Sequence, residues 1–195
     1  MMRWLLIVLI VFGAWQWWGN RDIERAPGVI AAAAPEQRVI AADPPQFQKK
    51  GYTVTALARF ALTARVLGVE NYHVDRESDL APVDFALGWG PMSDSAVLSK
   101  LKISQGGRYY QWRTDEFPIP RREIEVNSAN MHLIPATPAI ETQLKRARTG
   151  SIVQLSGYLV EARAGDGWRW MSSLTREDIG AGACELIWVE QIELR

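Results

Sequence analysis

An unbroken apolar run near the N-terminus constrains this chain more than any other feature. The run extends from Trp4 to Trp18 without a charged side chain, and only Arg3 precedes it. As an α-helix it would extend about 22 Å at ~1.5 Å per residue, short of the ~30 Å hydrocarbon core, and the flanking Met and Trp side chains narrow this gap. The run has no polar face, which argues against an amphipathic surface helix. We therefore expect residues 1–20 to form a helix that contacts membrane lipid.

The residues after the apolar run favour a retained anchor over a cleaved signal peptide. A cleavage site needs small side chains, but Trp15, Trp17 and Trp18 occupy that place. Tryptophan prefers the headgroup region, so these rings would mark a membrane boundary. Arginines on both sides of the run leave the orientation balanced, but a short anchor followed by a large domain favours export. We expect a single-pass protein of the bacterial inner membrane with a periplasmic C-terminal domain.

The rest of the chain divides into a spacer and one domain. Residues 21–50 are rich in Ala and Pro, which predicts a spacer, although two Pro-containing extended segments docked on the domain are an alternative. Residues 51–195 have the composition of a compact globular domain. The chain has 22 basic and 22 acidic residues, so it lacks the bulk positive charge typical of nucleic-acid binding. Nucleic acid is therefore not an expected partner.

The cysteine and histidine content argues against disulfide and metal stabilisation. The chain has 1 Cys and 2 His, and their spacing does not resemble that of a zinc site. We expect no metal, no cofactor and a fold that depends on packing.

Strand patterns outnumber helix patterns after residue 51. Strands are predicted for 59–69, 107–113, 151–164, 168–173 and 184–194. One short helix is predicted for 93–102 with Ser93 as its N-cap, and another for 137–150 with Thr137 as its N-cap and Pro138 in the first turn. The pattern predicts an α+β domain with a mainly antiparallel sheet, or a partly closed barrel, and two short helices.

The stretch NSANMHLIP, residues 127–135, has two interpretations. If a strand extends from Ile124, alternation places Asn130 and His132 on one side. A face that changes from apolar to polar favours a turn, because Asn and Ser bond their own backbone. The alternative is a polar pocket that contains Asn130 and His132.

Cys184 and His132 also permit a thiol-based reaction. An imidazole can activate a thiolate for hydrolysis or transpeptidation. A lone cysteine at the start of an apolar strand is more typical of a small buried residue. The catalytic interpretation therefore stays an alternative.

Aromatic residues supply further binding candidates. Trp89, in an acid-rich segment, is placed for stacking on a sugar or for burial beside a Gly-Pro turn. Trp168 and Trp170 are two residues apart on a predicted strand and share a face, which either belongs to the core or contacts a partner. Arg176 and Asp178 lie in a polar, Gly-containing segment that is a surface loop or a ligand-binding loop.

Three blocks taken together carry a resemblance: LAPVDFALGWGPMSD, SANMHLIPA and SSLTREDIGAGACE. They resemble blocks of uncharacterised membrane-anchored proteins of proteobacteria, a family without a known activity, over most of residues 52–190. The resemblance implies an anchored domain and supplies no catalytic residues. We expect a binding or assembly module that contacts a protein partner or envelope glycan.

Overall fold

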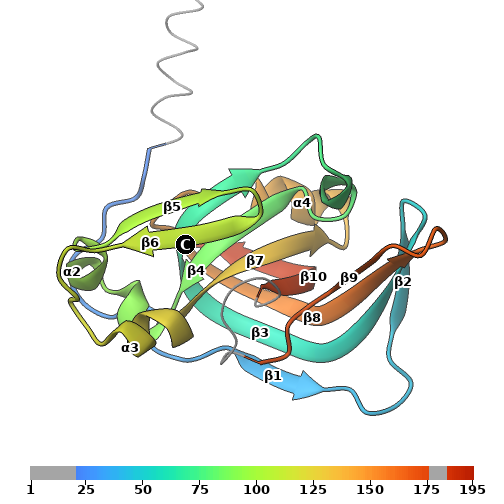
Figure 1. Ribbon diagram of the computed structural model, residues 1–195, viewed down its shortest axis with the longest axis horizontal. Helices are drawn as coiled ribbons and strands as arrows, with labels where there is room; N and C mark the ends of the chain where they lie inside the picture. The colour runs from blue at the N-terminus through green and yellow to red at the C-terminus, as the bar shows by residue number, and fades with distance from the viewer. Residues whose placement is uncertain (1–20, 176–183) are drawn as a thin grey trace, which may run out of the picture.

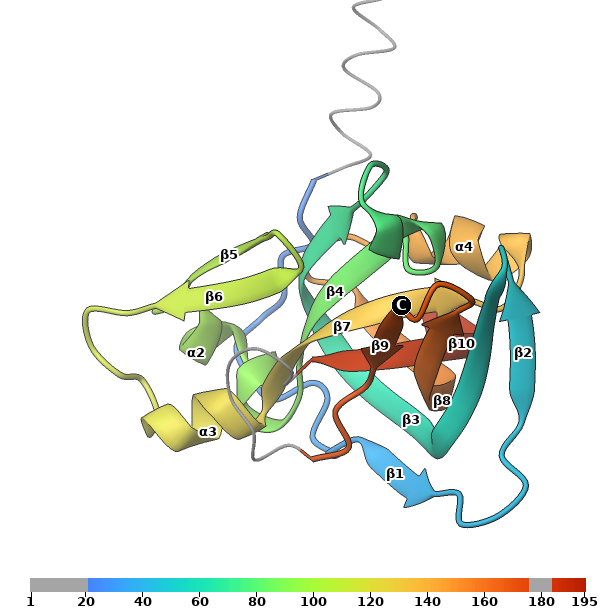
Figure 2. The ribbon, with the colours of Figure 1, turned by 45° about the vertical axis from the view of Figure 1, so that its right-hand side comes forward.

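Strands of the domain close into a ring. The computed structural model describes residues 21–175 and 184–195; the predicted anchor, residues 1–20, lies outside them. Along the ring, each strand pairs with the next and the last pairs with the first, antiparallel except for one parallel pair, β7 with β10. The ring (Figures 1 and 2) consists of β3 (Tyr52–Asn71), β4 (Val83–Gly88), β7 (Ser128–Pro135), β10 (Glu185–Leu194) and β8 (Ile152–Ala164). The predicted mainly antiparallel, β-rich domain is confirmed.

Shorter elements surround this ring. Strands β1 (Glu36–Val39) and β2 (Gln46–Lys49) pair with β3, and β9 (Arg169–Met171) pairs with β8. A separate hairpin joins β5 (Lys102–Gly106) to β6 (Tyr109–Arg113). The helices are η1 (Arg76–Asp79), η2 (Gly90–Ser93), α2 (Ser95–Leu98), α3 (Arg121–Val126) and α4 (Pro138–Leu144). The described residues thus contain α3 and the two 3-10 helices, η1 and η2, in addition to the two predicted helices.

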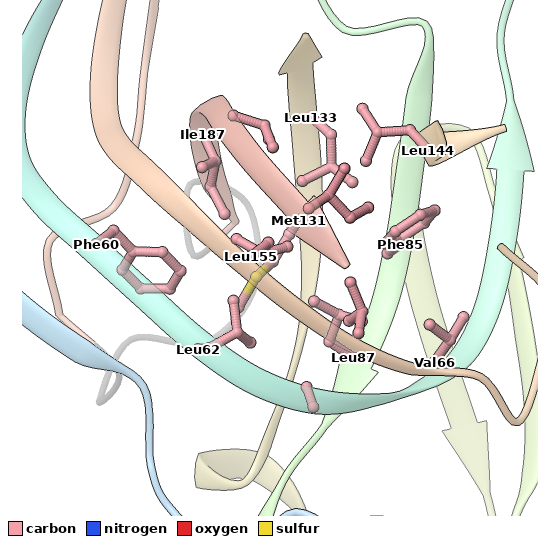
Figure 3. Close-up of a cluster of buried hydrophobic side chains, with 14 of the residues drawn as sticks. Phe60, Leu62, Val66, Phe85, Leu87, Met131, Leu133, Leu144, Leu155 and Ile187 are labelled. Carbon is pink, nitrogen blue, oxygen red and sulfur yellow. The ribbon is translucent and has the colours of Figure 1, made fainter. Parts of the chain in front are cut away.

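The ring encloses the main hydrophobic core, which Figure 3 shows. Because side chains alternate along a strand, one set of positions points inward and the other outward. Phe85 of β4 and Met131 of β7 are fully buried inside the ring, and Leu144 of α4 joins them. The neighbouring positions Asp84 and His132 therefore lie on the outer face of the same two strands. The apolar alternation that builds the core also positions the polar residues considered below.

The segment predicted as a spacer lies against the barrel along much of its length. The Ile23 amide donates to the Thr149 carbonyl at 2.8 Å, and the Arg25 side chain donates to the Gly150 carbonyl at 3.0 Å. Further along, the Gly90 amide donates to a carbonyl of this segment, at Ala31. With β1 and β2 paired to β3, residues 21–50 follow the docked alternative, because their backbone groups find partners on the domain.

The predicted N-caps have different outcomes. Thr137 caps α4, since its side chain accepts from the Ile140 amide, but α4 ends at Leu144, earlier than predicted. Ser93 is not the cap of α2: the Asp94 carboxylate accepts from the Ala96 amide at 2.8 Å instead. The Ser93 hydroxyl is engaged by the N-terminal segment, which the local pattern does not reveal.

Replacing Ser93 with alanine should lower the free energy of unfolding by about 2 kcal/mol, because several buried backbone groups lose one partner. The fully buried Ser93 hydroxyl accepts from the amides of Ile30 and Ala31 at 3.1 Å and donates to the Gly90 carbonyl at 2.7 Å. Urea unfolding in detergent micelles measures the loss. Ser99→Ala is the control, because the Ser99 hydroxyl is exposed and bonds a single carbonyl. Equal losses in the two variants would contradict the expectation.

Candidate functional site

The stretch from 127 to 135 is a strand for most of its length. Helix α3 ends at Val126, and β7 begins at Ser128. Both the favoured turn and the strand from Ile124 are therefore wrong. The change from apolar to polar residues occurs because the outward-facing positions of this strand contact other polar groups. Asn130 and His132 lie on the outer face of β7, and each is 4% exposed.

The imidazole of His132 is fixed by a buried carboxylate. Register places Asp84 of β4 directly opposite His132 of β7. The Nδ1 atom of His132 lies 2.9 Å from Oδ2 of Asp84, which is 0% exposed. A carboxylate accepts hydrogen bonds, so Nδ1 of His132 donates to Asp84 and Nε2 is the ring nitrogen left for other contacts. This arrangement orients a base, as in carboxylate–histidine pairs.

Arg108 joins this pair to the β5–β6 hairpin. It occupies a two-residue turn with Gly107, at φ values of 70° and 57°. Such a turn favours glycine or asparagine at both positions. An arginine there carries backbone strain, and the contacts of its side chain must offset that cost. The Arg108 guanidinium donates to Oδ1 of Asp84 at 2.9 Å, to both carboxylate oxygens of Asp75 at 2.7 and 2.9 Å, and to the Ala81 carbonyl at 2.8 Å.

Asn130 and Tyr72 complete the polar cluster. Nδ2 of Asn130 donates to the Arg108 carbonyl at 3.0 Å, and its Oδ1 accepts from Gln105 at 2.8 Å. The centre of the Tyr72 ring lies 3.7 Å from the Arg108 guanidinium. The Tyr72 hydroxyl accepts a hydrogen bond from the Arg108 amide at 2.9 Å. Oε1 of Gln105 has no hydrogen-bond partner among the described residues, but the other polar groups named here bond one another, and such networks are rigid. The network therefore holds the hairpin on the barrel and fixes the His132 ring.

Trp170 packs on the cluster, and Trp168 lies beside Trp170. The ring of Trp170 lies 4.8 Å from that of His132, and the ring of Trp168 lies 5.2 Å from that of Tyr52. The guanidinium of Arg76 lies 4.9 Å from the Trp168 ring. Both tryptophans are partly buried against the same outer cluster, as expected for one shared face. We call Arg76, Trp168 and Trp170 the tryptophan surface.

The dependence of the free energy of unfolding on acid pH tests the contacts of Arg108. Hydrogen bonds from Arg108 hold the pKa of the Asp75 carboxyl below its ordinary value of 3.8. A lowered pKa contributes stability that is fully present above pH 3.8 and is lost as the pH falls through the folded-state value. We expect Asp75→Asn to flatten the fall in stability below pH 3.8, as measured by urea unfolding between pH 2 and 6. An unchanged acid limb would contradict this.

Other predicted site residues lie elsewhere. Trp89 is 2% exposed and packs in the main core, as the burial alternative expected, so its ring does not reach a surface. Cys184 is partly buried immediately before β10, two residues before Leu186, which pairs with His132. Arg176 and Asp178 lie outside the described residues. No group of three or more His, Cys, Asp or Glu within residues 21–175 and 184–195 is placed to hold a metal ion.

Sequence reasoning missed the central members of the cluster. Asp84 belongs to the acid-rich segment around Trp89 and received no role of its own, although it interrupts the apolar strand VDFALG, where an unpaired charge is costly. Arg108 received no role, although a Gly-Arg pair between two alternating segments signals a turn that places a side chain at φ > 0. At both positions the residue type conflicts with its local structure. Such conflicts often mark functional or strained positions.

Comparison with known proteins adds no relative: no family model matches the chain, and neither a curated protein nor a solved structure matches it. In the part of the chain that the structure describes, no helix is long and apolar enough to cross a membrane.

Proposed function

We propose that this chain is a single-pass inner-membrane protein whose periplasmic domain is a binding or assembly module for a protein partner or envelope glycan. Residues 1–20 would remain in the bilayer as the anchor. The tryptophan surface is the contact site. The carrying observation is a partly exposed pair of tryptophans, Trp168 and Trp170, fixed above a buried and internally bonded polar cluster.

The composition of this surface supports contact with another molecule. Trp, Tyr and Arg are enriched among the residues that dominate binding energy in interfaces. Here the rings are already held in place, Trp170 by His132 and Trp168 by Tyr52 and Arg76. Binding to a preorganised surface costs little conformational entropy. If the two tryptophans only filled the core, they would not need an arginine beside them. The Arg76 side chain is 38% exposed.

The barrel topology supports the same location by analogy. Five-stranded Greek-key barrels of the OB type bind oligonucleotides or oligosaccharides on the face of their second and third strands. Strands β4 and β7 are the second and third strands of this ring, and they carry Asp84 and His132. The balanced charge of 22 basic and 22 acidic residues disfavours the oligonucleotide. Fold analogy identifies a face, and the side chains must identify the ligand.

In-cell photocrosslinking tests the proposal. Val74 is 97% exposed and lies two residues before Arg76, so a photoreactive amino acid there would sit beside the tryptophan surface without altering it. We expect a discrete adduct in native cells after illumination. An adduct digested by a muramidase identifies glycan, and an adduct of fixed mass digested by a protease identifies a protein. The matched control is Phe117, which is 50% exposed and lies after β6, where we expect no such adduct.

The adduct at position 74 should disappear in Arg76→Ala and in Trp168→Ala with Trp170→Ala. Arg76→Ala removes an exposed group, so loss of folding does not explain a negative result. An adduct of unchanged strength in both variants, or none in the unaltered surface, would refute binding at this location.

A thiol-dependent hydrolase or transpeptidase is the second candidate. The favouring observation is the orientation of His132 by Asp84, together with Cys184 immediately before β10, the strand that pairs with that of His132. In this reading Nε2 of His132 activates the Cys184 thiol. Rapid alkylation of Cys184 at neutral pH, slowed by His132→Gln, would favour it. If Cys184→Ser and His132→Ala leave cellular function intact while the double tryptophan variant abolishes it, the enzyme candidate fails.

A further inference from the structure

The N-terminal segment is fixed to one end of the barrel. The Ile23 amide donates to the Thr149 carbonyl at 2.8 Å. The Arg25 side chain donates to the carbonyls of Gly150 at 3.0 Å and Arg195 at 2.8 Å. These contacts join the start of the described chain to the loop between α4 and β8 and to the end of β10. The segment therefore cannot swing freely relative to the barrel.

A glycine makes this close approach possible. Gly150 has φ of +87°, and a Cβ at this position would lie 2.0 Å from the Ile23 carbonyl oxygen. Any other residue would be strained and would also displace Ile23. The chain is thus locally adapted to hold its N-terminal segment against this loop.

The proposed anchor ends close to this contact. Residue 20 and Ile23 are three positions apart, and three fully extended residues span at most about 11 Å. If residues 1–20 remain in the bilayer, Ile23 stays within that distance of the membrane boundary, and the barrel end that holds Ile23 stays there too. The inference rests on the proposed anchor.

The charges around this contact match a membrane surface. Lys145, Arg146 and Arg148 directly precede Thr149, and Arg146 is exposed. Arg21 and Arg25 lie in the docked segment. The acids nearby are Asp22, Glu24, Glu70, which lines one hollow with Asp22 and Thr149, and Glu141, which pairs with Lys145. Basic side chains next to a bilayer are attracted to anionic lipid headgroups. We define the membrane end as Arg21, Arg25 and residues 145–150.

We propose that the membrane end lies on anionic phospholipid headgroups, so that the domain is held at the bilayer in one orientation. Strand β8 starts at Ile152 beside the membrane end and runs to Ala164, about 40 Å along its curved path at ~3.3 Å per residue. Trp168 and Trp170 follow Ala164 after a turn. The tryptophan surface therefore follows the end of β8 that is opposite to the membrane end.

Fluorescence quenching in vesicles tests the orientation. The full chain, in a Cys184→Ser background, receives one fluorophore at Gln143→Cys near the membrane end or, as the matched control, at Arg163→Cys near the far end of β8. Vesicles contain phosphatidylglycerol and phosphatidylcholine with a headgroup nitroxide quencher. We expect the label at 143 to lose most of its fluorescence and the label at 163 to keep it.

A lengthened tether separates the effect of charge from that of the anchor. A flexible Gly/Ser insertion of about 20 residues between Arg21 and Asp22 lets the domain leave the surface. In vesicles with phosphatidylglycerol the label at 143 should stay quenched, and in pure phosphatidylcholine, or with Arg146→Glu and Arg148→Glu, the quenching should be lost. Loss of quenching in both lipids would overturn the headgroup contact.

The vesicle experiment distinguishes failure of the proposed anchor from failure of the proposed orientation. If the unmodified chain floats with the vesicles but neither label is quenched, or both are quenched equally, the orientation is refuted and the anchor stands. If the chain does not float with the vesicles, the anchor itself is refuted.

Discussion

Replacing Asp84 with alanine should lower the free energy of unfolding by about 3–5 kcal/mol, the usual cost of removing one partner from a buried ion pair. Asp84 is 0% exposed, and it accepts bonds from Arg108 and His132. Without it, the Arg108 guanidinium, whose side chain is 13% exposed, keeps only Asp75 as a charged partner, and Nδ1 of His132 loses its bond to a carboxylate. Urea unfolding of the full chain in detergent micelles, followed by near-ultraviolet circular dichroism, measures the loss.

A second substitution measures the contact between Arg108 and Asp84 itself. Arg108→Leu combined with Asp84→Ala should lose less stability than the sum of the two single variants, because each single variant already removes this contact. Glu141→Ala is the matched control, since it removes a carboxylate from the exposed pair with Lys145 and should change stability by less than about 0.5 kcal/mol. A loss below about 1 kcal/mol for Asp84→Ala would show that the cluster is not the buried network described here.

Replacing Gly157 with alanine should destabilise the barrel by about 3 kcal/mol or more, at or beyond the upper end of the usual cost of overpacking. An added Cβ would lie 1.9 Å from the Trp188 carbonyl oxygen and 3.1 Å from the Glu190 amide nitrogen. Both are backbone atoms at a register shift in β10, so no side-chain rotation relieves the clash. Strands β8 and β10, whose pairing helps to close the ring, must then move apart.

Gly106→Ala is the matched control for this effect. Gly106 also lies in a strand, but an added Cβ there meets nothing within 4 Å. Its stability should change by less than about 0.5 kcal/mol in the same urea experiment. Similar losses for Gly106→Ala and Gly157→Ala would mean that the strand contact at Trp188 does not constrain the barrel.

The extent to which the fold was predictable follows from how local each signal is. Alternation in the segment after Tyr52 predicted a strand, and the structure extends it to Asn71 because it pairs with both β4 and β8. Helix α3 was missed because a single short turn of helix has little period to detect. The docking of residues 21–50 was only an alternative, since its partners, such as Thr149, are distant in sequence.

The site shows the same division. Asn130 and His132 were identified as candidates by their position, but the turn was preferred because no partner was visible nearby. The partner is Asp84, 48 residues earlier in sequence, and strand register alone brings it opposite His132. Arg108 reaches the cluster through a hairpin of the separate two-stranded sheet. Contacts between residues far apart in sequence are set by tertiary packing, which local periodicity does not encode.

Hydrogen–deuterium exchange of the full chain tests the tryptophan surface most directly. Exchange in native envelope fragments, where the partner is present, is compared with exchange of the purified chain in detergent. We predict slower exchange in the envelope for residues 72–76 and 168–171, with no difference in the β5–β6 hairpin tip at Gly106 and Gly107. Identical exchange of the tryptophan surface in both preparations would contradict its assignment as the contact site.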